Sequence, residues 1–293
     1  MLERSAHELS IEEESILEKN LIWILGSPRS GTTWLASLIR DYDAIHFEEP
    51  LIGLHLGFLE NRGLNFTRRV DKAHERKHYF FSDEFEEVWK KYLRKLILNR
   101  IYAQFPKCLS KKIVIKEPNG SMGADMISKC LPESKIIFLL RDARDVLNSQ
   151  VTALSEGGYA AKASKIWKPL LKDKRMNHIK AACYQYLAII EIVQKAFKSH
   201  MGQNRIMIRY EDLRQDNKNH LKKILEFVGF SYNGAKMDQV IEKHTFENIP
   251  EEEKGMGTTR QFAKVGIWKE RFSNEEIKTI EEILGSKLKE LGY

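Results

Sequence analysis

Short, unbroken apolar runs separated by longer helical patterns give this chain of 293 residues its basic layout. Apolar runs of this length are typical of buried parallel strands, and they lie near 21–25, 112–116, 135–140 and 205–210. Apolar residues recur with helical spacing most clearly over 84–104, 176–199, 216–228 and 274–291. Strands that alternate with helices predict an α/β fold of three layers, in which helices cover both faces of a central parallel sheet.

The first predicted strand runs into a glycine-framed turn and then into a helix. Gly26 closes the apolar run, Pro28 fixes one backbone angle, and Gly31 allows conformations that other residues avoid. A helical pattern follows over residues 32–40, so free backbone N–H groups and the positive end of a helix dipole meet beside Arg29. Hydroxyl groups add donors at the same place: Ser30, Thr32 and Thr33. The segment therefore predicts a site for a phosphate or sulfate group.

The spacing of the two glycines is that of a P-loop, but one residue departs from the pattern. The lysine expected directly after Gly31 is Thr32, and the cation lies inside the loop as Arg29. A nucleoside-triphosphate kinase needs that lysine, a Mg²⁺ held by a hydroxyl group and an acidic partner for the metal. The departure counts against ATP chemistry. A P-loop kinase or NTPase using Mg-ATP stays as the alternative, favoured by Asp142 just after the strand at 135–140.

Two motifs in this frame resemble a known family of enzymes. Residues 28–34 read Pro-Arg-Ser-Gly-Thr-Thr-Trp, which resembles the first motif of the sulfotransferases that use 3′-phosphoadenosine 5′-phosphosulfate (PAPS). The strand at 135–140 is followed by Arg141 and by a helix that carries Ser149 eight positions later. In this family such an arginine and serine hold the 3′-phosphate, a role that suits the planar donor fork of arginine. The resemblance thus implies PAPS as sulfuryl donor and adenosine 3′,5′-bisphosphate (PAP) as product.

Two later segments extend the resemblance. The Tyr-Glu-Asp segment at Tyr210 and the loop at 244–249 are similar to adenine-contacting parts of the family, with Trp34 as a second aromatic face. The stretch 258–269 resembles the family's C-terminal basic loop, although its basic residues are spread out. Across all motifs, the resemblance implies that the nucleotide contacts Arg29, Ser30, Gly31, Thr32, Thr33, Trp34, Arg141, Ser149, Tyr210, Thr245, Phe246, Arg260, Lys264 and Gly266.

Sulfuryl transfer needs cations around the developing charge and a base for the acceptor proton. Arg29 and Lys116, which ends a predicted strand, are the cations that the resemblance implies. The histidine that cytosolic members carry two residues after this lysine is Pro118 here. The segment 46–51 resembles instead the Glu-Pro element with which carbohydrate and protein-tyrosine sulfotransferases present a glutamate base. It implies Glu49 as the base, with further candidates in the order Glu48, then His46 and Glu117.

The matches run from about residue 21 to 272, which favours a single domain over residues 1–293 with an N-terminal arm at 1–20. The stretches 51–111 and 155–200 match no motif. In the family such stretches form the acceptor pocket, and the resemblance implies the same role here. Gly157 and Gly158 indicate either a flap hinge or an ordinary loop. Six aromatic residues of these stretches could line an acceptor pocket or pack in the core: Trp89, Tyr92, Tyr102, Phe105, Tyr159 and Trp167. A hydroxyl or amine of a small molecule, lipid, saccharide or peptide fits equally well.

The overall charge suits an anionic ligand. Forty-eight basic and forty-one acidic residues leave a net charge of +7, with a pI near 9.1. No zinc spacing, helix-turn-helix signal or aromatic RNA motif supports a nucleic-acid partner, and three scattered cysteines predict neither disulfides nor a metal site. The sequence lacks a signal peptide and any run of about twenty apolar residues. We therefore expect a cytoplasmic enzyme that requires no metal, or a catalytic domain cut from a longer protein.

Overall fold

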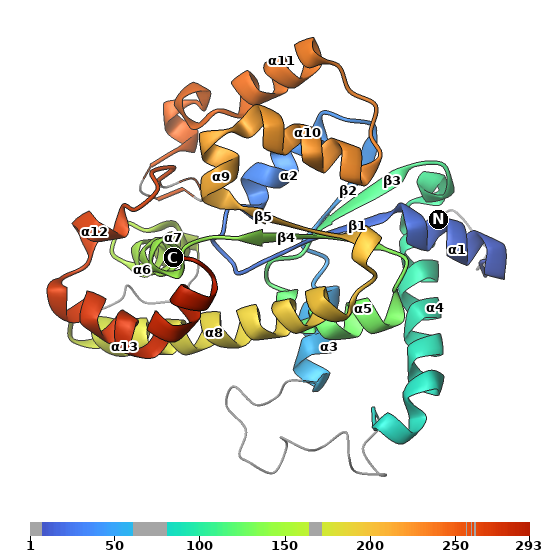
Figure 1. Ribbon diagram of the computed structural model, residues 1–293, viewed down its shortest axis with the longest axis horizontal. Helices are drawn as coiled ribbons and strands as arrows, with labels where there is room; N and C mark the ends of the chain where they lie inside the picture. Colours follow the sequence, from blue (N-terminus) through green and yellow to red (C-terminus); the bar gives the residue numbers. More distant parts are fainter. Residues whose placement is uncertain (1–7, 61–80, 164–171, 256, 259, 261) are drawn as a thin grey trace.

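The computed structural model describes residues 8–60, 81–163, 172–255, 257, 258, 260 and 262–293. Its centre is a sheet of five parallel strands in the order β2-β3-β1-β4-β5 (Figure 1). The strands are β1 (Leu21–Leu25), β2 (Ala44–Glu48), β3 (Lys112–Lys116), β4 (Lys135–Leu140) and β5 (Arg205–Arg209). The predicted α/β fold with a central parallel sheet is thus confirmed, including all four predicted strands.

One strand, β2, was absent from the sequence prediction. It lies at the edge of the sheet and pairs only with β3, and most of its residues are half-buried. Its His46 and Glu48 interrupt the apolar run that marks the inner strands. An edge strand with this composition lacks the continuous hydrophobic signal that buried parallel strands carry.

Helices account for most of the remaining described residues. The first six are α1 (Ile11–Asn20), α2 (Thr32–Arg40), α3 (Ile52–Glu60), α4 (Glu86–Gln104), α5 (Ala124–Cys130) and α6 (Ala143–Leu154). They are followed by α7 (Tyr159–Ala163), α8 (Arg175–Ser199), α9 (Tyr210–Gln215), α10 (Asn217–Val228), α11 (Gly234–His244), α12 (Trp268–Arg271) and α13 (Asn274–Glu290). The four helices predicted from periodicity correspond to α4, α8, α10 and α13. No helix in the described part of the chain has the length and apolar character needed to cross a bilayer.

The sheet separates two hydrophobic cores, as the alternation of side chains along β1 illustrates. Leu21, Trp23 and Leu25 enter the core that α5, α8 and α13 cover, whereas Ile22 and Ile24 enter the core under α2, α10 and α11. In Figure 1, α10 and α11 lie above the sheet and α5 and α8 below it. All five residues of β1 are buried, which explains why this strand reads as an uninterrupted apolar run.

The carboxyl ends of the strands lie along one edge of the sheet and carry most of the predicted site. Lys116, the last residue of β3, pairs in register with Ile24 of β1 and with Glu48 of β2. The loop between β1 and α2 starts at Gly26, where a Cβ atom would lie 2.4 Å from the carbonyl oxygen of Leu139. Glycine is therefore required for β1 to leave the sheet at this point. Ligand sites in open α/β sheets lie at this edge.

Candidate active site

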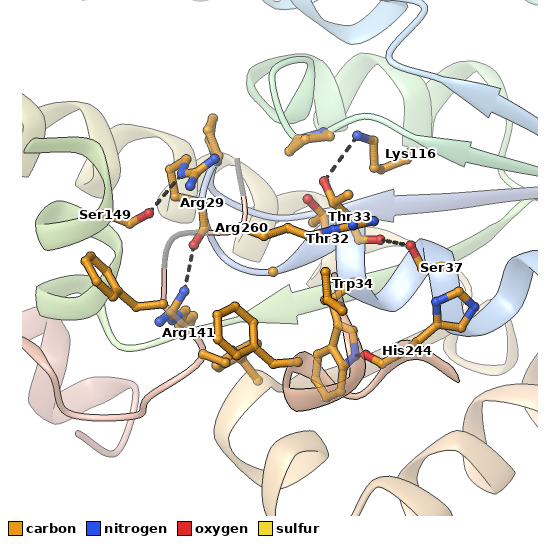
Figure 2. Close-up of a pocket in the computed structure, with 18 of the residues that line it drawn as sticks. Arg29, Thr32, Thr33, Trp34, Ser37, Lys116, Arg141, Ser149, His244 and Arg260 are labelled. Carbon is orange, nitrogen blue, oxygen red and sulfur yellow. Dashed lines mark hydrogen bonds between the residues drawn. The ribbon is translucent and has the colours of Figure 1, made fainter. Parts of the chain in front are cut away.

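A cavity of about 650 Å³ opens over this edge of the sheet. Its walls come from the β1–α2 loop, from the residues that follow β2, β3, β4 and β5, and from the segment between α11 and α12 (Figure 2). The structure brings twelve of the predicted site residues to this one cavity: Arg29, Gly31, Thr32, Thr33, Trp34, Glu49, Lys116, Arg141, Ser149, Tyr210, Phe246 and Arg260. Residues far apart in the sequence therefore line a single site.

The β1–α2 loop presents an open helix N-terminus to the cavity. Gly31 is the N-cap of α2, with φ of 98°, and no described side chain caps the first turn. A Cβ atom at Gly31 would lie 2.6 Å from the ring of Tyr210, so both the conformation and the packing require glycine. The first N–H groups of a helix have no partner within the helix and carry its positive dipole end. This loop can therefore bind an anion through its backbone.

Arg29 lies inside the loop in a left-handed conformation, with φ of 74°. A non-glycine residue in this region costs about 1–3 kcal/mol, which the surrounding structure must offset. Its Nε donates a hydrogen bond to the Oγ of Ser149 over 2.9 Å, and its guanidinium lies 5.1 Å from the centre of the Tyr159 ring. Burial lowers the pKa of Arg29 below its usual value. Arg29 nevertheless stays charged, because arginine titrates far above neutral pH.

Arg141 lies beside the same loop (Figure 2). Its Nη1 donates to the backbone oxygen of Arg29 over 3.1 Å, and its guanidinium lies 4.3 Å from the centre of the Tyr210 ring. Its Nε is buried and has no hydrogen-bond partner among the described residues. A buried donor of this kind is costly unless an acceptor arrives. Arg141 and the neighbouring Ser149 therefore fit the phosphate group that the family resemblance implies for them.

Aromatic rings form the next part of the wall. The rings of Trp34 and Tyr210 lie 5.7 Å apart, edge to face, and Phe246 also lines the cavity. The indole Nε1 of Trp34 donates to the backbone oxygen of His244 over 3.0 Å, which fixes the ring against the end of α11 (Figure 2). Rings held in this way can stack on a nucleotide base.

At the end of β3, Lys116 lies between two glutamates. Its Nζ is 2.8 Å from the Oε1 of Glu49, 3.1 Å from the Oε2 of Glu48 and 3.4 Å from the Oγ1 of Thr33. Burial alone would lower the pKa of Lys116, but the two carboxylates hold it above its usual value. The pKa of Glu48 is lowered, because Lys116 and Arg40 outweigh the opposing effect of burial.

The backbone around Glu49 is unusual. Glu49 has φ of 44° and Leu51 has φ of 61°, both in the left-handed region. The amide of Glu49 donates to the backbone oxygen of Lys116 over 2.9 Å, which ties the segment to the end of β3. The side-chain amide of Asn119 donates a hydrogen bond to Oε2 of Glu49. Non-glycine residues held in sparsely populated conformations cluster at functional sites, and here they are the predicted base itself and a residue two positions after it.

Five predicted residues do not line the cavity: Ser30, Glu48, Thr245, Lys264 and Gly266. The hydroxyl of Thr245 donates to the backbone oxygen of Ile241 over 2.7 Å, and Lys264 pairs with Glu270 on the exposed surface. The Oγ of Ser30 is buried without a hydrogen-bond partner among the described residues. The roles of all five stay predictions from the sequence.

Gly266 contacts the buried Asp145 of α6. The fully buried carboxylate of Asp145 accepts hydrogen bonds from the backbone amides of Gly266, over 2.8 Å, and Trp268, over 3.2 Å. One Nη atom of Arg141 lies 4.0 Å from the same carboxylate. Asp145 thus joins α6 and Arg141 to the C-terminal segment that carries Arg260. Arg260 itself pairs with Glu253 at the cavity wall.

The other candidates for the base lie away from the cavity wall. Glu117 is completely buried and His46 is half-buried on β2, and neither lines the cavity. Glu49 is therefore the candidate for the base that lines the cavity.

Of the six aromatic residues proposed for an acceptor pocket, Tyr159 lines the cavity. Trp89 is buried against Phe81, and Phe105 packs against Phe47. Tyr102 packs against the larger core, whereas Tyr92 is exposed. Trp167 lies outside the described residues.

Asn119 and Arg214 are among the lining residues that the sequence analysis did not propose. Asn119 comes directly after the Lys-Glu-Pro segment, and its contact with Glu49 was not visible from spacing. Arg214 lies one helical turn after Tyr210, and its guanidinium is 5.5 Å from the centre of the Trp34 ring. The sequence did carry a signal for Arg214, because it lies four residues after Tyr210 and a helix places residues with this spacing on the same side.

Comparison with known proteins identifies the family of this chain. The model of the sulfotransferase family matches residues 22–234, which include most of the cavity-lining segments. The chain belongs to the sulfotransferase family. Sulfotransferase 2A1 of Rattus norvegicus is 21% identical over 169 residues, which cover 53% of this chain and 57% of the rat protein. The chain thus matches little more than half the length of this relative.

Two solved structures show the same fold. Mouse sulfotransferase SULT7A1 complexed with PAP has a TM-score of 0.57 at 15% identity, covering 96% of this chain and 91% of the mouse chain. Retinol dehydratase in a complex with retinol and PAP has a TM-score of 0.57 at 17% identity, covering 92% of this chain and 82% of that chain. At these identities the likeness establishes the fold alone.

Proposed function

We propose that this sulfotransferase transfers a sulfuryl group from PAPS to a hydroxyl or amine acceptor. The observation that carries the proposal is that one cavity contains all the groups such a reaction needs. They are the uncapped N-terminus of α2, the cations Arg29 and Lys116, the pair Arg141 and Ser149, and an aromatic wall. Family membership and the PAP held by similar structures support the same nucleotide. Neither observation favours the alternative of a P-loop kinase.

The residues present fit a nucleotide with two phosphate-type groups. The unpartnered Nε of Arg141, with Ser149 nearby, suits the 3′-phosphate, whereas the open N-terminus of α2 suits the 5′-phosphosulfate. Trp34, Tyr210 and Phe246 offer rings for the adenine. When bound, PAPS supplies the sulfuryl group and a phosphate leaving group. Within the described residues, no group of three or more His, Cys, Asp or Glu side chains could hold a metal ion.

In this mechanism Glu49 takes up the proton that the hydroxyl or amine of the acceptor loses. The oxygen or nitrogen of that group forms a bond to sulfur. The sulfur–oxygen bond that breaks lies in line with the new bond. Lys116, 2.8 Å from Glu49, and Arg29 stabilise the negative charge that develops on the transferred group and the bridging oxygen. Transfer of this kind depends on positioning and electrostatics more than on covalent chemistry. The acceptor class stays open among small molecules, lipids and saccharides.

Calorimetric titration with PAP in EDTA tests the nucleotide site. We expect tight binding without a metal, and Arg141→Ala should weaken it about 100-fold, because a buried charge-assisted contact is lost. Arg144→Ala is the matched control, since Arg144 pairs with Asp142 and does not line the cavity. No binding of PAP, together with binding of ATP once Mg²⁺ is restored, would overturn the proposal in favour of a kinase or NTPase.

Glu49→Gln tests the base separately. The amide keeps the shape of the side chain but is a very poor proton acceptor, so turnover should fall about 100-fold or more while PAP affinity is retained. The matched control is Glu281→Gln, which makes the same change at an exposed glutamate of α13 that does not line the cavity and should leave turnover unchanged. Turnover can be followed as PAP release in a screen of acceptors. Full turnover in Glu49→Gln would remove Glu49 from the mechanism.

A further inference from the structure

Helix α4 carries a row of exposed apolar side chains along its outer face. Phe85, directly before the helix, is 43% exposed, and Val88, Tyr92 and Leu96 are 54%, 62% and 65% exposed. Their spacing of three, four and four residues places all four on one face of a helix. Figure 1 shows α4 at the margin of the molecule, extending away from the sheet. Single exposed apolar residues are ordinary, but a continuous row on a helix marks a contact surface.

A row of charges runs beside the apolar row. Glu84, Glu87, Lys91 and Lys95 each precede one member of the apolar row by one residue, so the two rows follow the helix side by side. The charges are ordered, with both acids towards the start of the helix and both lysines further along it. Arg94, on another face, is occupied with Glu14 and Glu18 of α1.

The order of residues in both rows suits antiparallel contact between two copies of α4. A twofold axis near residue 90 would set Phe85 against the partner's Leu96, and Val88 against the partner's Tyr92. On the flank it would set Glu84 against the partner's Lys95, and Glu87 against the partner's Lys91. Antiparallel helices bring the same flank of each copy together, so every facing pair is of opposite charge. In a parallel pair, opposite flanks of the two copies would meet, and these charges would not face one another.

We propose that this protein forms a symmetric homodimer through α4, with an apolar seam made by the row from Phe85 to Leu96. The charge order favours a second copy over an anionic lipid surface, because Glu84 and Glu87 would face the lipid headgroups. At present Glu87 pairs with Lys90, and Lys95 pairs with Glu8, both on the surface. Surface ion pairs contribute little free energy, so replacing them by ion pairs across the seam costs little. One helix pair makes a small interface, so the dimer is expected at micromolar concentrations.

Sedimentation velocity over the micromolar range tests this proposal. The unaltered protein should pass from monomer to dimer, and Tyr92→Glu should raise the dissociation constant about tenfold or more. The matched control is Tyr184→Glu, which introduces the same charge at an exposed tyrosine of α8 and should leave the dimer intact. Far-UV circular dichroism and PAP binding show whether each variant is folded. A monomer at every concentration, or a dimer that Tyr92→Glu does not weaken, would overturn the proposal.

A charge exchange tests the antiparallel geometry. Glu87→Lys alone sets a lysine against the partner's Lys91 and should weaken the dimer, as should Lys91→Glu alone. The double variant with both changes restores opposite charges across the seam and should recover the dimer. Failure of the double variant to recover what the single variants lose would rule out the antiparallel seam. Monomeric protein that binds vesicles of anionic phospholipid, and loses this with Tyr92→Glu, would assign the face to a membrane instead.

Discussion

Glu117 is a carboxyl group in an unfavourable place, directly after the lysine of the proposed active site. It is 0% exposed, and neither of its oxygens has a hydrogen-bond partner of good geometry among the described residues. A Cβ atom at Gly120 would lie 2.1 Å from its Oε1, so the turn closes tightly over it. Burial raises the pKa of Glu117 to about 7, although the nearby amides of Leu51 and Gly53 act in the opposite direction. The group therefore holds a proton at pH values where most glutamates are ionised.

This raised pKa predicts a stability that falls as the pH rises. The folded protein binds the Glu117 proton more tightly than the unfolded chain does, so the contribution is complete below about pH 4.5 and is lost as the pH rises through about 7. A difference of about 2.5 pKa units corresponds to about 3 kcal/mol. Urea unfolding at pH 5 and pH 8 measures the free energy of unfolding. Between these two pH values the free energy of unfolding of the unaltered protein should fall by about 3 kcal/mol more than that of Glu117→Gln.

The exposed Glu281 of α13 provides the control, because Glu281→Gln should leave the pH dependence of unfolding unchanged. Equal pH dependence in Glu117→Gln and the unaltered protein would contradict the raised pKa.

At the scale of single elements, the inner strands and the β1–α2 loop could be predicted because local sequence determines them. The five buried residues of β1 form a continuous apolar run, and the conformations at Gly26 and Gly31 are ones that glycine adopts readily. The edge strand β2 could not be predicted in this way. Its identity as a strand depends on pairing with β3, a segment about seventy residues later, and not on its own half-polar composition.

The same distinction applies to the site. Arg29, Arg141 and Tyr210 directly follow strand ends or lie in the β1–α2 loop, so a motif that identifies the strand also brings them to the cavity. The C-terminal segment has no strand to direct it. Its path is set by the contact of Asp145 with the amides of Gly266 and Trp268, which depends on tertiary structure. Lys264 consequently lies outside the cavity, although Arg260 lines it.

At the scale of the whole molecule, the cavity joins segments from Pro28 to Ala263. Both hydrophobic cores contain residues of β1, and the core covered by α8 also contains residues of α13 near the end of the chain. We propose on this basis that residues 1–293 form one domain. Segments so far apart in sequence can bind one ligand only while the whole domain is folded.

One cooperative unfolding transition, moved as a unit by nucleotide, is the result expected of a single domain. A ligand that binds only the folded state at 100 times its dissociation constant stabilises that state by about 2.7 kcal/mol. PAP at this level should therefore raise the midpoint of thermal unfolding by several degrees, equally in far-UV circular dichroism and in tryptophan fluorescence. Tryptophans in β1, α4 and α12 report on separate regions: Trp23, Trp89 and Trp268. Arg141→Ala, with PAP affinity about 100-fold weaker, should reduce this stabilisation to about 0.4 kcal/mol and make the shift correspondingly small. A second transition that PAP leaves in place would instead divide the chain into two domains, only one of which holds the nucleotide.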